Sequence, residues 1–269
     1  MKTASLLCLI MFVVLTAFPL GSHADVTLTI QSEGKTSNIL IKDTLVRMSG
    51  DASGSDNAGE IIFNAKKQEL IALDPERKEA AVMNEADLQK MGNQLGNMMA
   101  QMQSQMQNMS PEQRQMMQQM MGGAFPQSAP KQEVKLKVIK TGEMKVLLGK
   151  KCSRIIVERD GEKAFEYWVA PKNSLEGGPE VVQAFASLGE FFSGLFDALK
   201  KTPMKQMLEN PYAAMERIDG VPLETVQYKN GKAERVTTIV TLTKESLSEE
   251  KFAIPSGFKT IRLADSLPG

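Results

Sequence analysis

The chain has 269 residues, 32 basic and 32 acidic side chains, and a single histidine, His23. Balanced charge argues against a nucleic-acid partner, because such binding rests on basic contacts to phosphates. If the N-terminal segment that carries His23 is removed, Ser-His and Cys-His catalysis and His-ligated zinc or iron are also excluded.

Residues 1–24 predict a secretory signal peptide. Lys2 supplies a positive charge, a short apolar run follows, and small residues precede a cleavage point after Ala24. The apolar run is shorter than the ~20 residues that a membrane-spanning helix needs. We therefore expect an exported, periplasmic or secreted chain of residues 25–269 that forms a single soluble β-rich domain without a transmembrane segment.

The first part of the mature chain predicts an antiparallel meander. Apolar and polar residues alternate from Val26 onward, which is typical of strands with one buried face. The predicted strands are Val26–Gln31, Ser37–Met48, Glu60–Asn64, Glu69–Asp74 and Glu79–Met83.

A methionine- and glutamine-rich segment predicts a helical insertion over residues 85–123. Asn84 suits an N-cap, and the apolar spacing changes there from two residues to three and four. Ser110 and Pro111 restart the pattern, which predicts the two helices Glu85–Asn108 and Pro111–Met121.

The methionines of this insertion allow two functional interpretations besides plain packing. Thioethers prefer soft ions such as Cu(I) or Ag(I), and four of them repeat at a spacing of three, four and three residues: Met99, Met102, Met106 and Met109. The same stripe could bind a protein partner. A metal site would usually add histidine, cysteine or carboxylates, so we expect no bound metal and keep these four residues as the alternative.

The second part of the chain returns to strands. Alternation over Glu133–Ala170 and an Asp160-Gly161 turn predict a group of hairpins. Cys152 lies in this region and is the only cysteine after residue 24. It cannot form an internal disulfide, so we expect a buried, small apolar side chain.

A second long helix is predicted over residues 179–201, and strands follow it. The strands are Pro222–Tyr228, Glu234–Leu242 and Phe258–Leu263, with a short helix at Met204–Asn210 before them. The order of elements predicts an α+β fold: a large, curved, half-barrel-like antiparallel sheet whose concave face is covered by the second helix and the insertion.

The apolar stripe of the second helix is the candidate ligand-binding surface. Together with the single tryptophan, the predicted residues are Trp168, Phe185, Leu188, Phe192, Leu195 and Leu199. They would line an apolar cavity under the sheet. The competing interpretation is a solid core that stabilises the fold.

No catalytic or cofactor-binding motif is present. The sequence lacks G-x-S-x-G, a P-loop, G-x-G-x-x-G and H-E-x-x-H. We expect a protein that is not an enzyme and carries no cofactor.

Several phrases together resemble a family of exported bacterial proteins classed as a domain of unknown function. They are the segments 74–78 (DPERK), 148–152 (LGKKC), 167–171 (YWVAP), 219–223 (DGVPL) and 252–259 (FAIPSGFK). The ensemble is also distantly similar to the LolA/LolB-like lipoprotein carriers, whose half-barrel encloses an acyl-binding cavity. This resemblance implies an exported binding or scaffold protein with an apolar, lipid-like ligand.

Overall fold

A computed structural model describes residues 25–49, 59–107, 135–199 and 218–263. Within these residues twelve strands form one open sheet. The predicted signal peptide, the helices Pro111–Met121 and Met204–Asn210, and Met109 lie outside them.

The first six strands form the predicted meander, in which each strand pairs antiparallel with the next. They are β1 (Asp25–Ser32), β2 (Lys35–Lys42), β3 (Leu45–Met48), β4 (Glu60–Asn64), β5 (Glu69–Asp74) and β6 (Glu79–Asn84). The single strand predicted over Ser37–Met48 is divided into β2 and β3, because the chain turns at Asp43, which has φ +49. Buried and more exposed residues alternate along β1, as its sequence predicts.

The second group of strands adds to the same sheet, because β11 pairs antiparallel with β1. It comprises β7 (Leu136–Leu147), β8 (Lys150–Arg159), β9 (Glu162–Ala170), β10 (Val221–Lys229) and β11 (Lys232–Glu245). With the last strand, β12 (Lys259–Arg262), the order across the sheet is β12-β6-β5-β4-β3-β2-β1-β11-β10-β9-β8-β7. Strand β7 is therefore one edge of the sheet.

The last strand departs from the predicted antiparallel arrangement. Strand β12 (Lys259–Arg262) pairs parallel with β6. The backbone N–H of Lys259 donates to the carbonyl oxygen of Lys78 at 2.8 Å, at the turn before β6. The sheet is thus antiparallel except at this edge.

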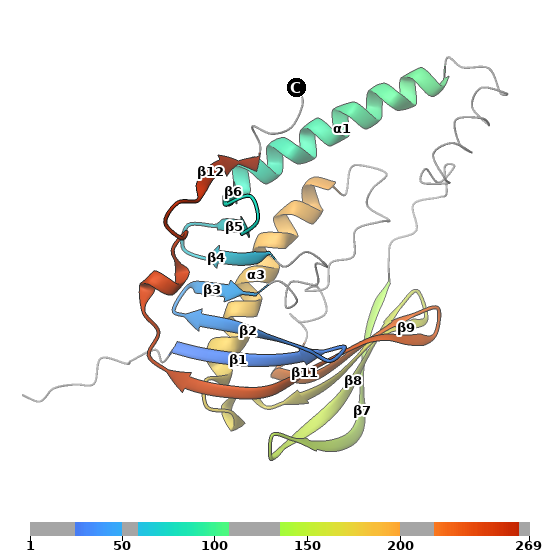
Figure 1. Cartoon of the computed structure of the whole chain (residues 1–269). Helices are drawn as coiled ribbons and strands as arrows, with labels where there is room; N and C mark the ends of the chain where they lie inside the picture. Colours follow the sequence, from blue (N-terminus) through green and yellow to red (C-terminus); the bar gives the residue numbers. More distant parts are fainter. Residues whose placement is uncertain (1–24, 50–58, 108–134, 200–217, 264–269) are drawn as a thin grey trace, which may run out of the picture.

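Helix α1 (Glu85–Gln107) starts where the N-cap is predicted. The Asn84 side-chain oxygen accepts the backbone N–H of Asp87 at 2.9 Å, and the Asp87 carboxylate accepts that of Asn84 at 3.0 Å. This reciprocal pair satisfies two N–H groups at the start of the helix. From there α1 projects away from the sheet (Figure 1).

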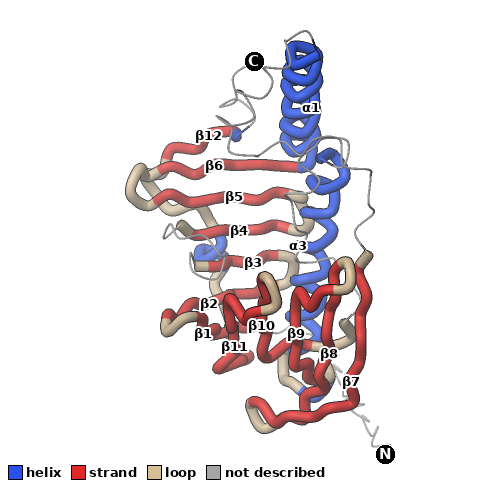
Figure 2. The backbone as a smooth tube through the Cα atoms, turned by 90° about the vertical axis from the view of Figure 1, so that its right-hand side faces the viewer, coloured by secondary structure: helices blue, strands red, loops and turns tan. Residues whose placement is uncertain are grey.

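Helix α3 (Gly178–Leu199) corresponds to the helix predicted at 179–201 as far as Leu199. A short 3₁₀ turn, η2 (Lys172–Ser174), leads into it from β9. Figure 2 shows the sheet bending so that strands from both of its ends flank α3. We call the sheet face that α3 covers the helix side.

The main core lies between α3 and the sheet. Val181 and Leu188 of α3 are fully buried there with residues of β1, β2 and β10, and Leu88 joins them from the first turn of α1. The rings of Phe63 and Phe191 pack with centroids 5.3 Å apart, linking β4 to α3. We call this cluster the helix-side core.

A crossover segment covers another part of the sheet, between β11 and β12. It contains the 3₁₀ turn η5 (Glu249–Phe252) and buries Leu247 and Phe252 against residues of β4, β5 and β6. The Asp25 carboxylate accepts the backbone N–H of Leu247 at 2.7 Å and pairs with Lys42 at 2.8 Å. These contacts tie the crossover to the start of the sheet.

Candidate functional site

The structure brings four of the six predicted ligand-binding residues to the helix-side core. Leu188 is fully buried in it, and Trp168, Phe185 and Phe192 are half-buried and pack against it. Leu195 and Leu199 belong to α3, but their side chains lie outside the described part of the structure. Leu188 therefore packs as core, whereas the three aromatic side chains keep part of their surface open.

Trp168 lies at the meeting point of β8, β9 and β10. It pairs with Arg154 of β8 on one side and with Glu224 of β10 on the other. The register of β10 shifts between Pro222 and Glu224, and such bulges redirect side chains. Because directly paired residues point to the same face, Arg154, Trp168 and Glu224 share the helix side.

Two cations flank the indole ring. The Nζ atom of Lys145 lies 5.5 Å from the ring centroid, and the guanidinium carbon of Arg154 lies 6.0 Å from it. Both distances are within the range of cation–π attraction.

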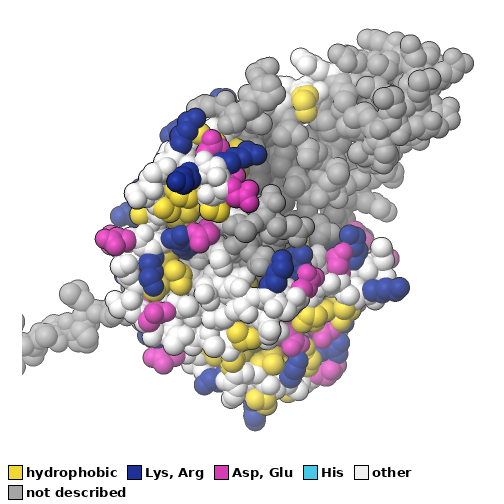
Figure 3. All heavy atoms as spheres, viewed as in Figure 1, with side chains coloured by type: hydrophobic (Ala, Val, Ile, Leu, Met, Phe, Trp, Pro, Cys, Tyr) yellow, Lys and Arg dark blue, Asp and Glu magenta, His cyan; other side chains and the backbone are white. Residues whose placement is uncertain are grey.

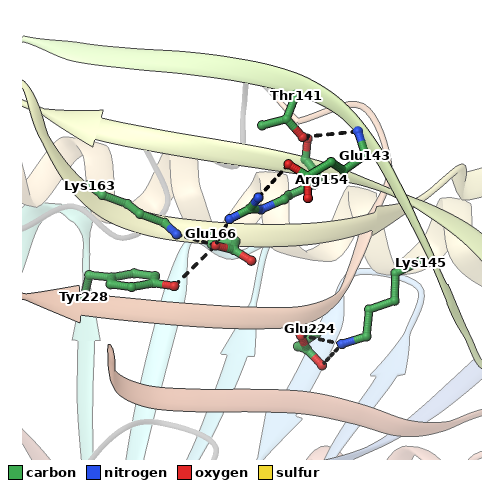
Figure 4. A network of polar contacts seen from close by, with 8 residues as sticks. All are labelled: Thr141, Glu143, Lys145, Arg154, Lys163, Glu166, Glu224 and Tyr228. Atoms are coloured by element: carbon green, nitrogen blue, oxygen red, sulfur yellow. Dashed lines mark hydrogen bonds and ion pairs between the residues drawn. The ribbon is translucent and has the colours of Figure 1, made fainter. Parts of the chain in front are cut away.

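Each of these cations is also held by a carboxylate (Figure 4). Lys145 Nζ donates to both oxygens of Glu224 at 2.9 and 2.8 Å. Arg154 Nη1 donates to Glu143 at 2.7 Å, and its Nη2 donates to Glu166 at 2.8 Å. The guanidinium therefore bridges an exposed carboxylate and a buried one.

Glu166 is the centre of this polar network. Lys163 donates to its Oε2, and the Tyr228 hydroxyl donates to the same oxygen at 3.3 Å. Burial alone would raise the pKa of Glu166, but the hydrogen bonds from Arg154 and Lys163 outweigh burial and lower it to about 2. The hydrogen bond to Glu166 in turn raises the pKa of Arg154.

The ion pairs of this network hold the side chains in place and are not suited to proton transfer. Glu166 stays ionised across the physiological range, and its Oε2 already accepts three hydrogen bonds, so it is a poor proton donor or acceptor for a reaction. We call Trp168 with Lys145, Arg154, Glu166 and Glu224 the Trp168 cluster. It presents a half-buried aromatic ring inside a fixed, charge-balanced polar rim.

The comparison with family models assigns residues 83–258 to the family described as "Domain of unknown function (DUF4412)". The chain belongs to this family. The match spans α1, α3 and the Trp168 cluster, so both parts of the candidate site lie inside the DUF4412 region.

Solved structures share only a weak likeness with this DUF4412 protein. An uncharacterized conserved protein from Thermus thermophilus matches with a TM-score of 0.42 and 10% identity, covering 90% of this chain and 91% of the other. PNGF-II in its C2 crystal form matches with a TM-score of 0.38 and 12% identity, covering 89% of this chain and 31% of the other. No curated protein matches. The lipoprotein-carrier resemblance therefore stays a hypothesis.

The soft-metal alternative also stays a prediction. The side chains of Met99, Met102 and Met106 in α1 lie outside the described part, as does Met109 as a whole. Among the described residues, no group of three or more His, Cys, Asp or Glu could hold a metal ion. Cys152 is fully buried, as predicted, and its burial raises the pKa of its thiol.

The helices of the described ranges include none that combines the length and the apolar character needed to cross a membrane.

Sequence reasoning missed the polar network around Trp168. Arg154 and Glu166 meet because β8 and β9 pair, but Glu224 and Tyr228 arrive from β10, about fifty residues further along the chain. The only local indication of this network in the sequence was Glu166, a charged residue two positions before Trp168 and therefore on the same face of the strand.

Proposed function

We propose that this DUF4412 protein is an exported, non-enzymatic binding protein that holds an apolar, lipid-like ligand on the helix side of its sheet. The observation that carries the proposal is the partial burial of three large aromatic side chains. Trp168, Phe185 and Phe192 pack against the helix-side core but are only half-buried. Aromatic rings left partly open beside a packed core offer apolar contact area to a ligand.

The polar rim of the Trp168 cluster supports an amphipathic ligand. Ligand sites combine apolar walls with a few fixed polar groups that orient the bound molecule. The ion pairs hold Lys145 and Arg154 beside the ring, so an acyl chain on the aromatic surface would place its polar end near fixed charges.

Residues 1–24 support export, because they have the features of a signal peptide with a cleavage point after Ala24. A chain cut there contains no histidine, and the buried carboxylate Glu166 is held in its ionised form. Binding of an apolar ligand requires neither a histidine nor a carboxylate that exchanges protons.

Native mass spectrometry after gentle purification tests this function. We expect a fraction of the protein to carry a lipid-sized adduct. Phe185→Gln removes apolar contact from a residue that is not fully buried, so it lowers the affinity for an added fatty acid about tenfold. The matched control is Gln183→Ala, an exposed position on the same helix, which leaves the affinity unchanged. An adduct-free spectrum together with no uptake of added fatty acid contradicts the proposal.

A protein partner of α1 is the second candidate function. Met98 of α1 is an exposed large hydrophobic side chain, and such a residue on a helix suits docking into a partner's groove. Met98→Gln should abolish a partner complex while leaving fatty-acid binding intact. Equal affinity of the Met98→Gln variant and the unchanged protein for the partner would contradict a docking role for Met98.

A further inference from the structure

The hairpin of β7 and β8 ends in an exposed apolar surface. Of five exposed large hydrophobic side chains in the described residues, three lie here: Met144, Val146 and Leu148, with 59%, 65% and 40% of their surface exposed. They are two residues apart, so Met144 and Val146 point to one face of the strand. Their cross-strand neighbours are the polar residues Ser153 and Lys151. We call Met144, Val146 and Leu148 the apolar hairpin end.

The turn of this hairpin contains an unusual residue. Leu148 has φ +48 and Gly149 has φ +69, which is the left-handed geometry of a two-residue hairpin turn. This geometry suits Asn, Asp and Gly and disfavours bulky apolar residues. Three other X-Gly turns of the sheet place Glu33, Asp160 and Asn230 at the equivalent position. Folding therefore gives no reason for a leucine at this turn.

Basic residues directly follow the apolar turn. Lys151 is exposed and Lys150 is half-buried, and both come immediately after Gly149. Figure 3 shows hydrophobic side chains at the lower end of the molecule, where β7 and β8 lie in Figure 1, with both basic and acidic side chains around them. Exposed apolar side chains next to lysines match the chemistry of an anionic lipid surface.

We propose that the apolar hairpin end docks the protein onto a bilayer surface that contains anionic phospholipid. Val146 and Leu148 enter the interface between headgroups and acyl chains, and Lys151, which pairs with Val146 and shares its face, contacts headgroup phosphates. The docking is peripheral, because only a hairpin end carries it.

Two observations favour a lipid surface over a protein. A stable protein interface buries about 800 Å² on each partner, far more than three side chains provide. Pairing of the β7 edge with another strand is also disfavoured, since a register shift between Lys140 and Met144 interrupts this edge. Bulges and lysines at an edge protect it from added strands.

The docking proposal goes beyond the ligand proposal and does not depend on it. Lys145 and Leu147 face the helix side, whereas Met144 and Val146 alternate with them on the other face. Substitutions at the hairpin end therefore leave the Trp168 cluster intact, and failure of one proposal is separable from failure of the other.

Vesicle co-sedimentation of residues 25–269 tests the proposal. The probes are vesicles of phosphatidylglycerol mixed with phosphatidylcholine, and vesicles of phosphatidylcholine alone. Val146→Thr with Leu148→Asn removes the apolar groups while keeping a strand-forming residue and a turn-forming residue. We expect this variant to bind the mixed vesicles at least about tenfold more weakly than the unchanged protein.

A second variant separates charge from insertion. Lys151→Gln should weaken binding to the mixed vesicles about fivefold and leave weak binding to phosphatidylcholine unchanged. The matched control is Val236→Thr, an exposed valine on β11, which keeps full binding.

Three results would overturn the proposal. The first is an unchanged protein that binds neither kind of vesicle. The second is equal binding by the Val146→Thr/Leu148→Asn variant and the unchanged protein. The third is self-association in solution that this variant abolishes without any vesicle binding, which would assign the hairpin end to a protein contact.

Discussion

The buried carboxylate Glu166 offers the sharpest energetic test of the Trp168 cluster. Glu166→Gln keeps the size and shape of the side chain but removes its negative charge. Its Oε2 accepts hydrogen bonds from Arg154, Lys163 and Tyr228. A glutamine can turn its one acceptor oxygen to the same donors, but that oxygen carries no negative charge, so Arg154 and Lys163 lose their ionic partner.

The expected loss follows from the pKa of this group. The pKa of Glu166 is about 2 in the folded protein, against about 4.3 for an ordinary glutamate. Each unit corresponds to about 1.4 kcal/mol, so the shift alone would give roughly 3 kcal/mol. Arg154 and Lys163 keep 22% and 28% of their side-chain surface exposed, and solvent screens their charges. We therefore expect a loss of about 2 kcal/mol near neutral pH.

The lowered pKa of Glu166 also determines how the stability difference between the two proteins changes with pH. Because the folded-state pKa lies below the unfolded-state value, the carboxylate stabilises the fold above about pH 4.3, and this stabilisation disappears as the pH falls toward about 2. Urea denaturation of both proteins over this range should therefore show a difference in unfolding free energy that is full at neutral pH and shrinks on acidification.

Glu143→Gln is the matched control, because Glu143 binds the same guanidinium but is 57% exposed. An exposed pair contributes about 0.5 kcal/mol or less. Equal losses for the two variants, or a Glu166→Gln deficit that persists unchanged at low pH, would refute the reasoning.

The remaining predictions concern stability and can be read from urea denaturation. Leu148→Asn should stabilise the protein by about 0.5–1 kcal/mol, because asparagine accepts the left-handed turn that strains leucine; a loss of stability would contradict this. Gly177→Ala should cost about 2–4 kcal/mol, because the residue has φ +86 and a Cβ would lie 2.6 Å from a valine side chain of β1. Gly161→Ala, with φ +89 and nothing within 4 Å, should cost only about 1 kcal/mol, so equal costs would rule out the steric argument. Asp25→Ala should cost about 1–3 kcal/mol, because it leaves the buried backbone N–H of Leu247 without its acceptor; an unchanged stability would refute that role.

Local features of the fold could be predicted from the sequence because they depend on neighbouring residues. The alternation from Val26 places β1, and the reciprocal Asn84 and Asp87 side chains mark the start of α1. The apolar spacing of the second helix predicts a buried stripe, and Leu188 is fully buried. Apolar residues that recur every two residues in a strand, or every three to four in a helix, show directly which face of the element is buried.

The pairing of distant strands could not be predicted, because the sequence of a short strand does not specify which other strand it pairs with. The parallel pairing of β12 with β6 depends on a crossover that Leu247 and Phe252 anchor against the sheet. The Trp168 cluster likewise needs the pairing of β9 with both β8 and β10, and the bulge that turns Glu224 toward the helix side. Neither the pairing nor the bulge has a local signature around Trp168.

Fluorescence of the single tryptophan tests the central claim most directly, because Trp168 lies within the proposed site. A bromine atom on an acyl chain quenches an indole ring only at close range, so a brominated fatty acid reports contact. We predict saturable quenching by the brominated fatty acid, little change with its unbrominated counterpart, and weaker binding in Phe185→Gln. Quenching that does not saturate, or that is the same in Phe185→Gln and the unchanged protein, would contradict an apolar ligand site on the helix side.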